Sequence, residues 1–166
     1  MDRRHALITA SAAALAPLAL GSAFAWAAPA AGAVDGRKLP ILAGGDFATM
    51  TSKLALARAN GSAVRAFAEL EINEQAAVAK AFGSRPGAAG LTPKQAALLQ
   101  ELESAPAAEF DTLYIQGQIL GHRELLALHK SYAASGSDPV AQGASIVAVP
   151  AIQTHLGMLQ TLKQIG

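Results

Sequence analysis

From residue 46 onward, apolar side chains recur every three or four residues over long stretches, and glycine, proline or a capping residue ends each stretch. This spacing places apolar side chains on one face of an α-helix. We predict long helices over residues 46–60, 63–82, 107–134 and 139–165, with a shorter helix over 93–104. No stretch alternates apolar and polar residues as a half-buried strand would. The sequence therefore predicts an all-α fold.

The connections between these segments predict how the helices are arranged. Thr92-Pro93-Lys94-Gln95 has the pattern of a capping box, and Asp138-Pro139 caps and opens the last helix. The turn at residues 60–62 is short, so the helices on either side of it are expected to be antiparallel neighbours. The chain is 52% hydrophobic with only 5% aromatic residues. We therefore predict an antiparallel four-helix bundle with an aliphatic core.

The N-terminal segment is predicted to be a cleavable signal peptide over residues 1–27. A basic start, an apolar run interrupted by Pro17, and small residues before cleavage sites after Ala25 or Ala27 support this interpretation. Arg3-Arg4 resembles a twin-arginine signal, although Asp2 replaces the usual hydroxyl residue. Residues 28–45 are expected to form a flexible lead-in to a domain over residues 46–165. This organisation predicts an exported, periplasmic protein.

Charge and composition exclude several classes of function. Cleavage would lower the count of Lys and Arg from 13 to 11 and that of Asp and Glu from 12 to 11, leaving a neutral chain. A neutral chain lacks the basic surface expected for nucleic acid or for an anionic membrane. No second apolar run is long enough to span a bilayer, and without cysteine there is no thiolate metal site. The alanine-rich helix faces are compatible with self-association.

The helix predicted over residues 63–82 turns two acids toward the interior. Its apolar face, at 100° per residue, carries Val64, Phe67, Glu71, Glu74, Val78 and Phe82. A buried carboxylate is costly unless it is paired. The last helix is predicted to turn inward a set spaced by three and four residues: Val140, Ala144, Val147, Ala151, His155, Met158, Leu162 and Ile165.

Four segments resemble the bacterial domain of unknown function 4142 family. They are "AVRAFAELEINEQ" (63–75), "FDTLYIQGQILGHRELLALHK" (110–130), "SGSDP" (135–139) and "VPAIQTHLGML" (149–159). The resemblance implies a secreted, ferritin-like helical bundle with no established activity. His122 and His155 match family positions, whereas Met50 and Gln75 stand where family members usually carry an acid and a histidine.

Facing helices can supply partners for the inward acids, and three interpretations are open, one of which is that Glu74 lies at the boundary of the buried face and simply reaches water. In the first, Glu71, Glu74, His122 and His155 form a buried polar network in a non-enzymatic binding or envelope-stress module with no cofactor. In the alternative, the same four residues bind one divalent ion of iron, manganese or zinc. The absence of any Glu-x-x-His motif argues against a ferritin-like di-iron site and favours the first interpretation.

His129 is predicted to be a hydrogen-bonded packing residue. It lies seven residues after His122 on the same helix, about 10.5 Å along its axis, so the two histidines cannot share an ion.

Overall fold

The computed structural model describes residues 35–165, and every regular element in that range is helical. The helices are α1 (Lys38–Arg58), α2 (Ser62–Ala81), α3 (Pro93–Ser104), α4 (Ala107–Ser135) and α5 (Pro139–Ile165). The predicted all-α class is confirmed. The predicted signal peptide and residues 28–34 of the predicted lead-in lie outside the described residues.

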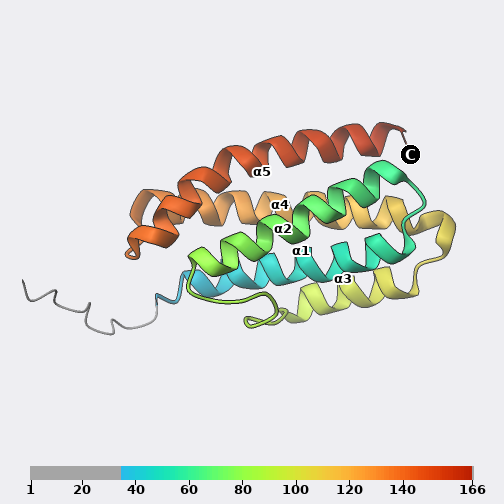
Figure 1. Cartoon of the computed structure of the whole chain (residues 1–166). Coiled ribbons are helices and arrows are strands. Elements are labelled where there is room, and N and C mark those ends of the chain that lie inside the picture. Colours follow the sequence, from blue (N-terminus) through green and yellow to red (C-terminus); the bar gives the residue numbers. More distant parts are fainter. Residues whose placement is uncertain (1–34, 166) are drawn as a thin grey trace, which may run out of the picture. The chain divides into compact units, whose positions relative to one another are not determined.

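The long helices lie side by side, and α1 and α2, like α4 and α5, run in opposite directions (Figure 1). The short helix α3 lies between α2 and α4 in the chain, so these two long helices run in the same direction. α1 packs against α2 and α4, and α5 packs against α4 and α2. The short helix α3 lies against α1 and α4. Within residues 35–165, no helix is both long enough and apolar enough to cross a membrane.

The first helix begins at Lys38, eight residues before the predicted start, so the expectation of a flexible lead-in is wrong for residues 38–45. The side chain of Ile41 is 1% exposed and belongs to the core. A Cβ atom on Gly44 would lie 2.7 Å from the Leu125 side chain, so this glycine lets α1 approach α4 closely. The small residues of this segment therefore pack in a helix, although the composition of the segment suggested a loop.

Capping residues define the starts of α3 and α5. Both hydrogen bonds of the predicted box between Thr92 and Gln95 are present. The Asp138 carboxylate accepts hydrogen bonds from the backbone N–H groups of Val140 and Ala141, which satisfies the first turn of α5.

The loop between α2 and α3 is held to α1 by one buried acid. The Asp46 carboxylate accepts hydrogen bonds from the backbone N–H groups of Gly87, Ala89 and Gly90. Gly87 and Gly90 have φ angles of 84° and 74°, which favour glycine, and these angles aim the N–H groups at one carboxylate. Asp46 is therefore a structural residue.

The buried face of α5 is rotated by about one residue from the predicted face over most of its length. Val140 and Val147 are 67% and 69% exposed, and Met158 and Ile165 are exposed as well. The buried residues are Ala141, Ser145, Ala148, Ile152, His155, Leu159 and Leu162. The helix is apolar on all sides, so spacing alone does not select a face. Ser145 can face inward because its hydroxyl hydrogen-bonds His129.

Two apolar clusters divide the interior along the helices. One contains Phe67, Phe110 and Leu159, and the other contains Phe82, Leu125 and Ile152. On α2, α4 and α5 alike, buried polar residues occur in the chain between members of the two clusters. The interior therefore has a polar layer with apolar packing on both sides.

Candidate metal centre

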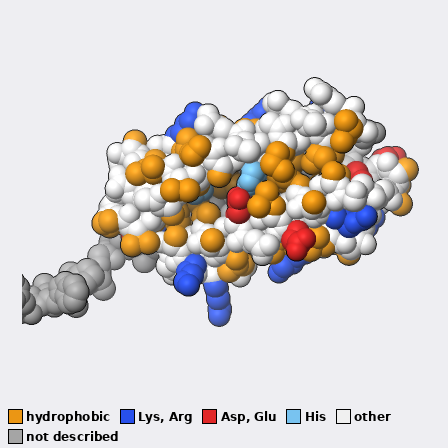
Figure 2. Space-filling model, turned by 45° about the horizontal axis from the view of Figure 1, so that its top comes forward, with side chains coloured by type: hydrophobic (Ala, Val, Ile, Leu, Met, Phe, Trp, Pro, Cys, Tyr) orange, Lys and Arg blue, Asp and Glu red, His pale blue; other side chains and the backbone are white. Residues whose placement is uncertain are grey.

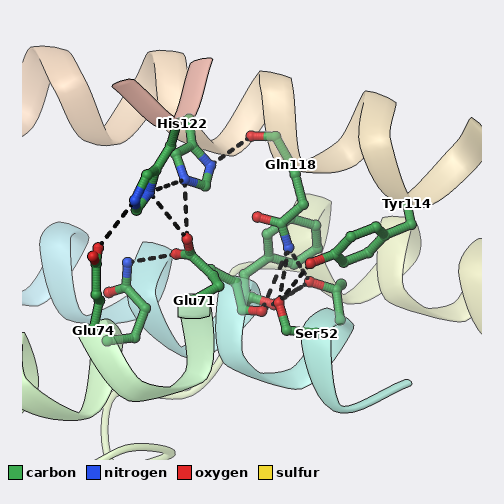
Figure 3. A network of polar contacts seen from close by, with 11 residues as sticks. Ser52, Glu71, Glu74, Tyr114, Gln118 and His122 are labelled. Atoms are coloured by element: carbon green, nitrogen blue, oxygen red, sulfur yellow. Dashed lines mark hydrogen bonds and ion pairs between the residues drawn. The ribbon is translucent and has the colours of Figure 1, made fainter. Parts of the chain in front are cut away.

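Three side chains from three helices meet in the polar layer: Glu71 of α2, His122 of α4 and His155 of α5 (Figure 3). Glu71 Oε2 lies 3.2 Å from His122 Nε2 and 3.4 Å from His155 Nδ1, and the two ring nitrogens are 3.3 Å apart. The side chains are 0%, 1% and 6% exposed, respectively. The predicted common interior layer of acids and imidazoles is confirmed for these three residues.

Glu74, the fourth predicted residue, lies on the outer side of His155. Its Oε2 atom is 3.2 Å from His155 Nε2, the ring nitrogen that points away from Glu71. The Glu74 side chain is 39% exposed. Glu74 therefore lies at the boundary of the interior, as one of the three interpretations of the sequence has it, and contacts His155 from there. Glu74 is partly exposed because it lies three residues after Glu71 on α2, at the border of the buried face.

Each of the three central side chains has a hydrogen-bond partner outside the triangle. His122 Nδ1 donates to the backbone oxygen of Gln118 at 2.8 Å, and Gln75 Nε2 donates to Glu71 Oε1 at 2.7 Å. His155 Nε2 faces the Glu74 carboxylate, which accepts its proton. A carbonyl and a carboxylate can only accept, so these contacts assign the ring protons.

With the outer nitrogens protonated, a neutral His122 and a neutral His155 each turn a lone pair inward. These two nitrogens and Glu71 Oε2 lie at the corners of a triangle with sides of 3.2, 3.3 and 3.4 Å. In a tetrahedral site with bonds of about 2.0–2.1 Å, neighbouring ligand atoms are about 3.3–3.4 Å apart. The spacing of the three atoms therefore matches one face of a tetrahedral metal site.

The charges of the cluster are coupled. Burial alone would raise the pKa of Glu71, but hydrogen bonds from His122 and His155, which form when these rings carry an inner proton, together with the charge of His122, outweigh it and lower this pKa to about 2. Burial lowers the pKa of His155, yet its hydrogen bond to Glu71 and the charges of Glu71 and Glu74 raise it overall. A buried anionic Glu71 therefore requires a positive charge beside it, which a proton or a metal ion can supply.

Helix α1 supplies space to this centre. A Cβ atom on Gly45 would lie 2.6 Å from Gln75 Oε1, so the glycine leaves room for the side chain that hydrogen-bonds Glu71. Met50, which stands where family members usually carry an acid, is 40% exposed. The first helix is therefore close to the centre without contributing a ligand.

A second polar network lies beside the first (Figure 3). Gln118 Nε2 donates to Thr51 Oγ1 at 2.8 Å, and the hydroxyl groups of Ser52 and Tyr114 are 2.9 Å apart. Gln118 also accepts from His122 through its backbone oxygen, which links the two networks. Sequence reasoning missed Gln75, Gln118 and Gly45. Gln75 and Gln118 each carried a signal, because Gln75 stands where family members usually carry a histidine and Gln118 is four residues before His122 on a helix.

His129 is separate from the centre, as predicted. It is 1% exposed, its Nδ1 atom is 3.0 Å from Ser145 Oγ, and its ring packs edge-on against Phe82. Burial lowers the pKa of His129 to about 4. The ring is therefore neutral at pH 7 and serves packing.

Comparison with known families agrees with the resemblance seen in the sequence. The model of the family described as domain of unknown function (DUF4142) matches residues 40–162, and the chain belongs to this family. Comparison with curated proteins and with solved structures gives no match to the chain.

Proposed function

We propose that this protein binds one divalent transition-metal ion through Glu71 Oε2, His122 Nε2 and His155 Nδ1. The observation that carries the proposal is the placement of these three atoms at metal-ligand spacing. Their outer partners hold both imidazoles in the tautomer a ligand needs, and such partners are typical of protein metal sites. A purely structural network would instead keep at least one proton inside the triangle, on an imidazole nitrogen that donates to Glu71.

The chemistry of the donors selects among metals. Two imidazoles and one carboxylate suit zinc, iron(II) and manganese, and the same set binds zinc in hydrolytic enzymes. The distances between the three ligand atoms are close to those of a tetrahedral site, which favours zinc. Three protein ligands leave at least one coordination position for water or another molecule.

The proposed architecture is a reduced ferritin-like bundle built from α1, α2, α4 and α5. Metal sites in such bundles take side chains that project inward from facing helices, and here α2, α4 and α5 supply them. Ferritin-like di-iron sites require two Glu-x-x-His motifs and further glutamates, and this chain contains no Glu-x-x-His motif. A mononuclear site is the form that the available ligands support.

We further propose that the protein acts as a binding module of the periplasm, exported by the signal peptide over residues 1–27. The basic start, apolar run and small-residue cleavage sites support export. N-terminal sequencing of the protein recovered from the periplasm tests this, and we expect a start at Trp26 or Ala28. Self-association through the alanine-rich helix faces remains a prediction that light scattering can test.

Two matched substitutions on α4 test metal binding. His122→Asn and His129→Asn each replace a histidine that is 1% exposed, and asparagine can keep the Nδ1 hydrogen bond in both cases. We expect untagged wild-type protein and His129→Asn to bind one equivalent of zinc. His122→Asn should bind it at least 100-fold more weakly, because the ligand atom is gone.

Equal zinc affinity in the two variants would contradict the proposal. So would thermal unfolding of the wild type that is unchanged by a chelator, which is the behaviour expected of a purely structural polar network.

A further inference from the structure

A groove lies between α2 and α5 on the face of the molecule where α5 is exposed. Its volume is about 570 Å³, within the range of small-molecule sites. Its walls are mostly small apolar side chains, including Ala77, Ala81, Ala144 and Val147. In Figure 2, apolar side chains gather around a histidine and an acidic side chain on one face.

One end of this groove reaches the proposed metal centre. Glu74, Gln75 and His155 line the groove, and each of them also contacts the centre or its ligands. The rings of His122 and His155 are covered by Phe67, which is 1% exposed and lies 5.9 and 5.6 Å from them, centroid to centroid. Of the three proposed ligands only His155, the most exposed of them, lines the groove, so the groove ends beside this ligand.

The lining indicates the chemistry of that molecule. No lysine or arginine lines the groove in the part of the chain that the structure describes, and burial keeps His129 in its wall neutral at pH 7. The acidic residue at this end of the groove, Glu74, faces His155 Nε2 at 3.2 Å. A divalent ion with Glu71 as its one anionic ligand would retain one positive charge, which attracts an anionic oxygen donor. The remaining wall is apolar and favours a hydrocarbon body.

The groove is long as well as apolar. Along α5 it extends from His155 to Val140, fifteen residues or about 22 Å. Gly143 lies about 18 Å from His155 on this axis. A linear chain with its polar head at His155 would pass Gly143 only if it is long.

We propose that the α2–α5 groove binds a free linear alkyl carboxylic acid whose carboxylate coordinates the metal ion. This inference rests on the proposed function, since the head group binds the ion. A helix of another protein is the less suitable occupant, because the volume corresponds to a small molecule.

Cobalt(II)-loaded protein provides the readout, because its visible spectrum responds to a change of ligand. Titrations with acetate, octanoate and hexadecanoate, each below its micelle-forming concentration, should all shift the spectrum. We expect octanoate to bind at least tenfold more tightly than acetate, since its chain adds buried methylene groups.

Two glycines of α5 offer a matched pair of variants. A Cβ atom on Gly143 or on Gly157 would meet no atom within 4 Å, so a side chain can start at either position without a clash, but only Gly143 lines the groove. We expect Gly143→Leu to weaken hexadecanoate binding at least tenfold and to leave octanoate binding unchanged. Gly157→Leu should change neither affinity.

Equal affinities for acetate and octanoate would overturn the inference. Equal hexadecanoate affinities in Gly143→Leu and Gly157→Leu would overturn it as well. If cobalt binds and either result is found, the proposed metal site stands while the proposed ligand falls. If no cobalt binds, the proposed function itself is contradicted.

Discussion

The Nε2 atom of His122 lies 3.3 Å from the Nδ1 atom of His155 inside the protein. The other nitrogen of each ring already donates its proton outward, to a carbonyl in one case and to a carboxylate in the other. Two neutral rings held in this way would face each other with lone pairs, beside the buried carboxylate of Glu71. A cation bound between the three atoms would offset the repulsion among the two lone pairs and the carboxylate. The predictions below follow from the presence of such a cation.

Glu74 should act on the metal through His155. We expect Glu74→Gln to lower zinc affinity by about 10–100-fold, the usual effect of removing a carboxylate from the outer nitrogen of a metal-bound histidine. Glu69→Gln, an exposed substitution on the same helix, is the control. Competition with a chromophoric chelator measures both, and equal affinities would show that the contact between Glu74 and His155 does not tune the metal.

Gly45 should be coupled to Gln75. In the wild type, Gly45→Ala displaces the Gln75 side chain and breaks its hydrogen bond to Glu71, which costs about 1.5–3 kcal/mol. The higher helix propensity of alanine offsets about 1 kcal/mol of this cost, so we expect the free energy of unfolding to fall by about 1 kcal/mol in total. In a Gln75→Ala background the same change should stabilise the protein. Denaturant unfolding of the four proteins tests this reversal of sign, and additive effects would contradict it.

Metal binding should compete with protons at His155. The pKa of this histidine is raised without metal, which favours its protonated form, and a nitrogen that binds a metal must be free of its proton. Zinc affinity should therefore increase with pH through the raised pKa of His155. Calorimetry in buffers of different ionisation enthalpy should detect proton release on zinc binding. Binding enthalpies that do not depend on the buffer would contradict this expectation.

His129 should make the metal-free protein sensitive to acid. Its pKa is about 4 in the folded chain against 6.5 ordinarily, so the unfolded chain binds more protons between these values. The free energy of unfolding should therefore fall by about 3 kcal/mol as pH drops from about 6.5 to about 4. His129→Asn cannot titrate and should lose this part of the decline. Identical pH profiles for the two proteins would show that burial of His129 is not the cause.

Helical spacing and capping residues were enough to predict the all-α class and the approximate extent of most helices. The same spacing predicted that Glu71, His122 and His155 share an interior layer, because a buried acid on one helix needs partners on others. In these cases the residue pattern itself carries the physical constraint.

The remaining features depend on contacts between helices, which spacing does not encode. The start of α1 was missed because Gly44 and Gly45 resemble loop residues until their close neighbours Leu125 and Gln75 are known. The buried face of α5 was misplaced because valine and isoleucine occur all around it. The position of Glu74 stayed open between the interior and the boundary, because helical spacing does not distinguish an inward acid from one at the border.

The most direct test of the central claim is the position of the metal in crystals of the zinc-loaded protein, located by anomalous scattering. We expect one strong peak about 2.0–2.1 Å from Glu71 Oε2, His122 Nε2 and His155 Nδ1. A peak bound elsewhere, or no peak beside these three atoms at saturating zinc, would contradict the account.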